Sequence, residues 1–71
     1  MVTLYTIDGC PDCRHWRKTL ENNQISFREK NLFTDDQAVD DLLASIGEIK
    51  APVLLWHKKQ IPLSSALDSR S

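Results

Sequence analysis

The pattern of apolar and polar residues along this 71-residue chain begins with a strand. Apolar and polar residues alternate over residues 2–7, which is typical of a strand with one face in a protein interior. Val2, Leu4 and Tyr5 are its expected buried members. The turn that follows contains Gly9, whose conformational freedom permits a tight change of direction.

The next stretch, residues 11–22, predicts a helix because no helix breaker follows Pro11. Proline fits the first turn of a helix, since the N–H that it lacks would be unpaired there in any case. We expect Asn22 and Asn23 to end this helix in a left-handed conformation. Its apolar positions recur at spacings of three and four and are expected to face a sheet. These positions are Cys13, Trp16 and Leu20.

A second strand is predicted over residues 26–32, and it carries an unusual number of charges. Phe27 and Leu32 are its expected buried members, and three consecutive charged residues lie between them. A charged strand of this kind is typical of a sheet edge or of a sheet with one solvated face. We expect one of these two positions for it.

A second helix is predicted to start near residues 34–37. Thr34 or Asp35 is expected to cap its N-terminus, and Gln37 lies three residues after Thr34, as in a capping box. Gly47 is a suitable residue at which to stop. The apolar positions recur at the helical period. They are Ala38, Val39, Leu42, Leu43 and Ile46.

The last part of the chain predicts two short strands and a short helix. Residues 53–56 form an apolar run directly after Pro52, and proline is tolerated at the first position of a strand. Residues 57–59 are expected to turn, residues 60–61 to form a fourth strand, and residues 64–68 to form a turn or two of helix.

The predicted order is strand, helix, strand, helix, strand, strand, helix. A helical crossover places the first strand parallel to at least one other strand. We therefore expect a single α/β domain over residues 1–71. Its core would be a small four-stranded mixed sheet flanked by helices, with a short last helix.

The only two cysteines, Cys10 and Cys13, lie where the first strand gives way to a helix, in the motif Cys-Pro-Asp-Cys. A thiolate is the nucleophile in disulfide exchange, and the unpaired N–H groups of a helix N-terminus stabilise negative charge. We expect Cys10 to attack and Cys13, one turn further along, to resolve the mixed disulfide. Charges of both signs surround the motif. They belong to Asp12, Arg14, Arg17 and Lys18.

The alternative for this pair is a structural role, as a static disulfide or as half of a zinc site. Structural zinc usually takes four Cys or His ligands. Besides the cysteines the chain offers His15 and His57, which lack the usual short spacing between paired histidines. One short turn would have to supply three of the four ligands, so we expect no metal at the motif.

Composition excludes several classes of function. The chain is 41% hydrophobic and 27% charged, which fits a globular domain. Its length is near the lower limit for folding without disulfides or a structural metal. The net charge is −1 and no basic stripe is present, so we expect no nucleic-acid binding. No apolar run approaches the ~18 residues of a membrane span, and no signal peptide precedes the first strand. We expect a cytoplasmic monomer, and in a reducing compartment paired cysteines are more often catalytic than structural.

Three stretches resemble glutaredoxins and NrdH-type redoxins, which have the thioredoxin fold. They are residues 4–6 leading into the cysteine motif, Phe27 in the second strand, and residues 51–53 before the third. The likeness extends nearly to Ile61. The resemblance implies a thioredoxin-like fold of glutaredoxin type and a thiol–disulfide oxidoreductase.

The resemblance also implies roles for individual residues. The family's proline that matches Pro52 is cis and lies beside the reactive disulfide, and the backbone before it pairs with the substrate. By this likeness Cys10 attacks and Cys13 resolves, while Ala51 and Pro52 hold the substrate. The further candidates for contact with substrate or glutathione are Pro11 and Lys50.

The same resemblance implies the source and destination of electrons. No bound cofactor is expected, and the disulfide would be reduced by glutathione or by an NADPH-dependent flavoprotein such as thioredoxin reductase. Protein or low-molecular-weight disulfides would be the substrates, with ribonucleotide reductase as one candidate partner.

Several positions differ from the pattern with which glutaredoxins hold glutathione. Ile7 replaces a lysine, Lys50 and Ala51 replace Thr-Val, and residues 62–65 replace a Gly-Gly and an acid. Lys50 would supply part of the missing attraction for a carboxylate. The Trp-Ser-Gly-Phe stretch of NrdH-type redoxins is also absent.

Two interpretations from other classes stay open. One is a non-enzymatic thioredoxin-like module that uses the cysteine pair for redox sensing, or for binding zinc or an iron–sulfur cluster. The other is a docking domain that keeps the fold without a reactive thiol.

Overall fold

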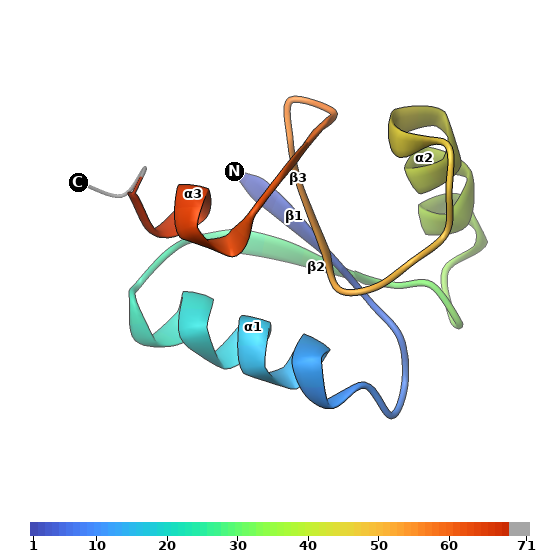
Figure 1. Ribbon diagram of the computed structural model, residues 1–71. Coiled ribbons are helices and arrows are strands. Elements are labelled where there is room, and N and C mark those ends of the chain that lie inside the picture. Colours follow the sequence, from blue (N-terminus) through green and yellow to red (C-terminus); the bar gives the residue numbers. More distant parts are fainter. Residues whose placement is uncertain (69–71) are drawn as a thin grey trace.

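Seven elements follow one another in the predicted order (Figure 1). The computed structural model describes residues 1–68. The elements are β1 (Val2–Thr6), α1 (Pro11–Asn22), β2 (Phe27–Asn31), α2 (Asp36–Ile46), β3 (Val53–Trp56), β4 (Lys59–Ile61) and α3 (Leu63–Asp68). The sequence therefore predicted every element in the described part of the chain, with boundaries that differ by one or two residues.

The four strands form one mixed sheet in the order β2-β1-β3-β4. β1 and β2 are parallel and joined through α1, whereas β3 runs antiparallel to both β1 and β4. β1 and β2 therefore end where β3 begins, and we call this the cysteine end of the sheet because the Cys10 loop follows β1 there. The opposite end, where β3 turns into β4, is called the hairpin end.

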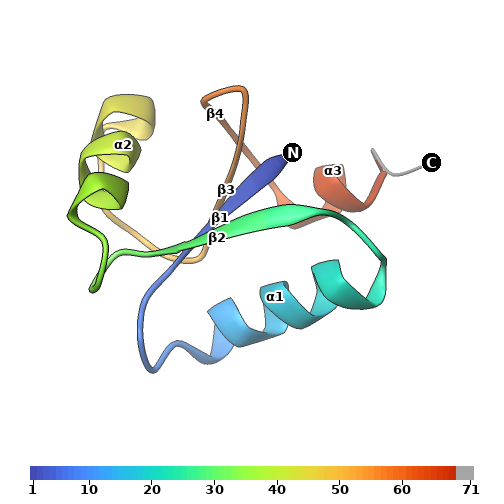
Figure 2. The ribbon, with the colours of Figure 1, turned by 180° about the vertical axis from the view of Figure 1, so that it is seen from behind.

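β1 is buried on both faces, so the sheet has two small cores. One core lies under α1 and α3 and the other under α2, as the two opposite views show (Figures 1 and 2). The first consists of Val2, Leu4, Leu20, Leu54 and Ala66. The second consists of Tyr5, Leu32, Ala38, Leu42, Val53 and Leu55. The predicted burial of Val2, Leu4 and Tyr5 is confirmed, and Phe27 is only partly buried.

β2 is an edge strand, as its charges predicted, and it is tied to a helix on each face of the sheet. Successive side chains of a strand point to opposite faces. Glu29 pairs with Arg17 of α1, with 2.6 Å between Oε1 and Nε. Its neighbour Lys30 pairs with Asp41 of α2, with 3.1 Å between Nζ and Oδ2. The charged residues therefore hold both helices to the edge of the sheet.

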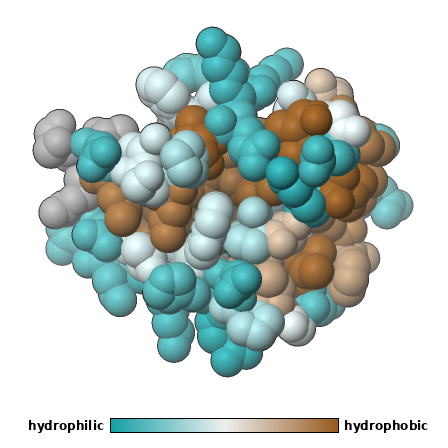
Figure 3. Space-filling view, viewed as in Figure 1, coloured by the Kyte–Doolittle hydropathy of each residue, from teal (hydrophilic) through white to brown (hydrophobic). Residues whose placement is uncertain are grey.

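Surface polarity differs between the two helix layers. In the space-filling view, polar residues cover α1, whereas apolar residues gather over α2 and the segment that enters β3 (Figure 3). Leu43 and Ile49 are about half exposed in that region, with 45% and 47% of their surface accessible. No helix within residues 1–68 is long and apolar enough to cross a membrane.

Two turns differ from the prediction. The left-handed residue after α1 is Gln24, with φ 58°, and not Asn22 or Asn23. The Asn23 side chain instead donates a hydrogen bond to the Thr19 carbonyl at 2.8 Å, which satisfies an unpaired acceptor of the last turn.

The hairpin between β3 and β4 is also tighter than predicted. Its turn contains only His57 and Lys58, and β4 begins at Lys59. Both turn residues have positive φ, 52° and 63°. This is the conformation that two-residue hairpins require and that Asn-Gly usually supplies. The turn was missed because His-Lys carries no such signal.

α2 begins with Asp35 as its cap, which is one of the two predicted caps, and not with a capping box at Thr34. The Asp35 carboxylate accepts hydrogen bonds from the N–H groups of Gln37 and Ala38, at 3.0 and 3.3 Å. The helix ends at Gly47, which has φ 76° and whose N–H donates to the Leu43 carbonyl. The sequence predicted this end of the helix correctly.

Replacing Asp35 with alanine removes both of these hydrogen bonds. We expect the free energy of unfolding to fall by about 1 kcal/mol, the usual cost of an N-cap. The matched control is Asp36→Ala, which removes an equal charge from the same helix end but no cap bond, and which should cost about 0.3 kcal/mol. Urea unfolding followed by circular dichroism measures both, and equal losses would contradict the capping role.

Candidate active site

The loop between β1 and α1 is held in a tight turn at the cysteine end. Gly9 adopts φ 73°, in the left-handed region that favours glycine. The Asn31 side chain, at the end of β2, donates a hydrogen bond to Asp8 Oδ1 at 2.7 Å. This contact ties the turn that precedes Cys10 to the neighbouring strand.

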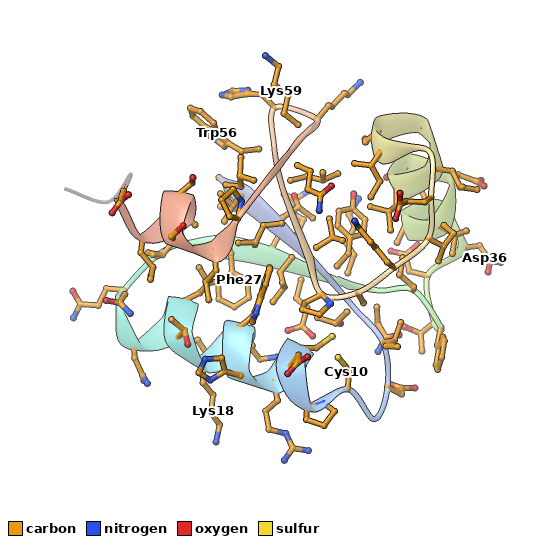
Figure 4. The ribbon with its side chains drawn as sticks, viewed as in Figure 1. Cys10, Lys18, Phe27, Asp36, Trp56 and Lys59 are labelled. Atoms are coloured by element: carbon orange, nitrogen blue, oxygen red, sulfur yellow. The ribbon has the colours of Figure 1, made fainter. Side chains whose placement is uncertain are left out.

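Cys10 is the N-cap residue of α1. Its backbone is extended, with φ −99° and ψ 107°, and its Sγ accepts a hydrogen bond from the Cys13 N–H at 3.1 Å. Pro11 is exposed and opens the helix, as predicted. Figure 4 shows Cys10 at the start of α1, on the side of the segment that enters β3. The helix therefore aims a backbone donor at this sulfur.

The two thiols lie in different environments. Both are free, and Cys10 is partly accessible whereas Cys13 is 1% exposed. Burial and the hydrogen bond to Cys10 raise the pKa of the Cys13 thiol to about 11. A hydrogen bond with the Ile7 backbone and the charge of Arg17 act in the opposite direction. At neutral pH Cys13 therefore stays protonated beside an accessible Cys10.

A polar network lies next to the buried thiol. Arg17, one turn after Cys13, donates from Nε and Nη2 to the two carboxylate oxygens of Glu29, at 2.6 and 2.7 Å. The Thr6 hydroxyl, which is 1% exposed, donates to Glu29 Oε2 at 3.0 Å. The hydrogen bonds from Arg17 lower the pKa of the Glu29 carboxyl, and the bond from Thr6 adds to this effect. The ion pair thus fixes Arg17 against the sheet.

The segment before β3 lies at the same end of the sheet. Tyr5 is paired with Val53, so the residues that precede β3 lie beside the loop that follows β1. The Ala51–Pro52 peptide bond is cis, which is the geometry that the resemblance implied. Lys50 is exposed and pairs with Glu48, with 3.3 Å between Nζ and Oε1.

The two histidines do not join the cysteines. His57 lies in the turn at the hairpin end, the opposite end of the sheet from Cys10. Within residues 1–68 no group of three or more His, Cys, Asp or Glu side chains is placed to hold a metal ion. The set of Cys10, Cys13, His15 and His57 is therefore not assembled in this structure.

Comparison with known proteins identifies the family. The family model described as glutaredoxin matches residues 2–61, which is most of the chain. This chain belongs to the glutaredoxin family.

Curated relatives of this glutaredoxin-family chain include regulators. The global transcriptional regulator Spx of Bacillus subtilis is 43% identical over 42 residues, which are 59% of this chain and 32% of that protein. Spx 2 of Bacillus anthracis is 45% identical over a stretch of the same length. The match therefore spans about a third of the length of these relatives.

Solved structures support the fold. The thioredoxin-like protein BC3987 superposes with a TM-score of 0.79 at 21% identity, covering 86% of this chain and 84% of that one. A buckwheat glutaredoxin–glutathione complex gives a TM-score of 0.69 at 16% identity, covering 97% and 66%. The predicted thioredoxin-like fold of glutaredoxin type is confirmed.

The sequence did not reveal the residues that brace this glutaredoxin-family site. Thr6, Glu29 and Asn31 contact residues 12 to 23 positions away, and no local spacing reports such partners. One signal was available for Thr6, a polar residue that alternates with Val2 and Leu4 and so shares the strand face that they bury. A buried hydroxyl needs a hydrogen-bond partner.

The ion pair between Glu29 and Arg17 makes stability depend on pH. The folded-state pKa of Glu29 is below its usual value of 4.5. The contribution of the ionised Glu29 to the free energy of unfolding is therefore fully present above about pH 5. It is lost as pH falls through the folded-state pKa. We expect Glu29→Gln to lower the free energy of unfolding by up to about 1 kcal/mol at pH 7. The difference from the unmodified chain should shrink below pH 4.5.

Thermal unfolding from pH 7 to pH 3 measures this dependence. Glu48→Gln is the matched control, because its pair with Lys50 is longer and more exposed. It should leave the stability nearly unchanged over the whole range. A Glu29→Gln curve that stays parallel to that of the unmodified chain down to pH 3 would contradict the role of the ion pair.

Proposed function

We propose that this chain is a dithiol oxidoreductase that reduces disulfides through Cys10 and Cys13. The observation that carries the proposal is the contrast between the two thiols. Cys10 is accessible and receives a backbone hydrogen bond at a helix N-terminus, whereas Cys13 is buried and has a pKa raised to about 11. Membership of the glutaredoxin family supports the same chemistry.

The first step is nucleophilic attack. The Cys10 thiolate attacks one sulfur of the substrate disulfide, a bond forms between the two sulfurs, and the other substrate sulfur leaves as a thiolate. The Cys13 N–H and the N-terminus of α1 stabilise negative charge at Cys10 before the attack.

The second step releases the product. Cys13 gives up its proton and attacks Cys10 Sγ, so that the bond between Cys10 and the substrate breaks. The departing sulfur takes up a proton and leaves as the second thiol. Two electrons have passed to the substrate, and the chain holds a Cys10–Cys13 disulfide. Glutathione or an NADPH-dependent flavoprotein such as thioredoxin reductase would return it to the dithiol, with no bound cofactor.

The surface around Cys10 favours a protein substrate. Phe33 follows β2 at the cysteine end and is 66% exposed, and Ile49 precedes β3 at the same end and is 47% exposed. The Phe33 N–H is bonded to Asn31, the residue that also holds the turn before Cys10. Two large apolar side chains are therefore exposed at the cysteine end of the sheet.

The surface offers less to free glutathione. Lys50, the residue proposed to attract a carboxylate, is already paired with Glu48 at 3.3 Å. We propose that Ala51 and Pro52 hold the backbone of an extended protein segment, with Pro11 beside it. The protein would act as a cytoplasmic monomer, and ribonucleotide reductase is one candidate substrate.

A second candidate function is redox sensing. The similarity to the transcriptional regulators named Spx supports it, because those relatives are regulators and the match with them covers 59% of this chain. In a sensor the same pair would be oxidised once per signal and would not turn over. A steady rate of disulfide reduction distinguishes the oxidoreductase from the sensor.

Single cysteine variants test the roles of the two thiols. Cys13→Ser should form a mixed disulfide with oxidised insulin or oxidised glutathione that persists, because the resolving thiol is missing. Cys10→Ser should form no adduct and should lose turnover, because Cys13 is buried and protonated. Mass spectrometry of the intact protein detects the adduct. Equal adduct formation by both variants would contradict the assignment.

A further inference from the structure

A cavity of about 380 Å³ opens at the hairpin end, away from the cysteines. It lies between α2 and the sheet, which are side by side in Figures 1 and 2. Thr3, Tyr5 and Leu55 form its floor, and Ala44 and Ser45 of α2 form a wall. Its volume is within the range of small-molecule sites, roughly 300–1,000 Å³.

The cavity exists because the last turns of α2 carry small side chains. Ala38 and Leu42 anchor the first part of the helix in the core and are fully buried. Further along, Ala44 and Ser45 face the floor and do not fill the space above it. The space between the end of α2 and the sheet is therefore left open to solvent as a hollow that a small molecule can enter.

The Tyr5 hydroxyl is presented to this cavity. Tyr5 as a whole residue is 3% exposed, and its hydroxyl forms no hydrogen bond with the residues that the structure describes. Burial raises the pKa of this phenol, and the charge of Asp41 adds to the effect, so the hydroxyl remains a donor at neutral pH. No buried side-chain oxygen or nitrogen of residues 1–68 lacks a hydrogen-bond partner, so the unpaired Tyr5 hydroxyl is open to the cavity and free to donate to a molecule there.

The charges around the cavity favour an anion. Asp41 lines it, but its two oxygens already accept hydrogen bonds from Lys30 and Gln37, both at 3.1 Å. Lys58 stands at the rim and forms no ion pair within the described residues. His57 lies beside it and offers a further donor. The rim therefore carries the positive charge of Lys58, which is held in no ion pair although it also acts on Asp41.

We propose that this cavity binds a small organic acid with a flat apolar body. The body would lie on the Tyr5 ring and Leu55, and the acid group would meet Lys58 and a neighbouring hydroxyl. The cavity and Cys10 are at opposite ends of the sheet, so this site is separate from the redox chemistry. If the cavity binds no such acid, the proposed oxidoreductase function is unaffected.

Three probes that share one ring test the proposal. They are indole-3-acetate, which is anionic, indole-3-acetamide, which is neutral, and tryptamine, which is cationic. Titration followed by backbone amide shifts gives both the site and the affinity. We expect shifts at the cavity residues, and affinity for the anion roughly fivefold to tenfold above the neutral probe, with tryptamine weakest. Equal affinities for the three probes, or no shifts at the cavity up to millimolar probe, would overturn the proposal.

Two variants and a control locate the contacts. Lys58→Gln should abolish the preference for the anion, and Tyr5→Phe, which keeps the ring, should weaken binding of the acid. Lys59→Gln is the matched control, since it removes the adjacent positive charge from a residue that does not line the cavity. A loss of affinity in Lys59→Gln as large as that in Lys58→Gln would overturn the proposed site. The amide spectrum of each variant shows that it is folded.

Discussion

Cys10 occupies a position that helices usually give to serine, threonine, aspartate or asparagine. Its Sγ accepts the Cys13 N–H at 3.1 Å, so one contact both starts α1 and joins the two cysteines of the site. The rest of the structure holds this contact in place. Gly9 turns the chain sharply after β1, and Asn31 fixes that turn to β2. In the proposed oxidoreductase, the residue that caps α1 is also the nucleophile.

A chain of this size has little core with which to support such a site. The sheet compensates by burying β1 on both faces, under α1 and α3 on one side and α2 on the other. The edge strand adds ion pairs to both helix layers, through Glu29 on one face and Lys30 on the other. The Glu29 pair has a second effect, because it holds Arg17 one turn away from the buried Cys13 thiol.

Much of this architecture was predictable from local patterns. The alternation of β1, the apolar stripe of α1 and the position of Gly47 each report a conformation within a few residues. The cysteine motif was found in the same way. The bracing contacts were not, because Thr6 and Glu29 are 23 residues apart and Asn31 and Asp8 are equally distant. The His57–Lys58 turn was missed for another reason, since its positive φ angles are imposed by the hairpin and not by residue preference.

In the proposed reaction Cys10 and Cys13 cycle between dithiol and disulfide and pass electrons to a substrate. The most direct measurement is NADPH consumption by the oxidised protein with insulin as substrate, in two parallel systems. One contains glutathione with its reductase, and the other contains thioredoxin reductase alone. We expect sustained consumption in at least one system and none with Cys10→Ser. Consumption in neither system would contradict the proposed redox cycle and would leave the sensor as the better interpretation.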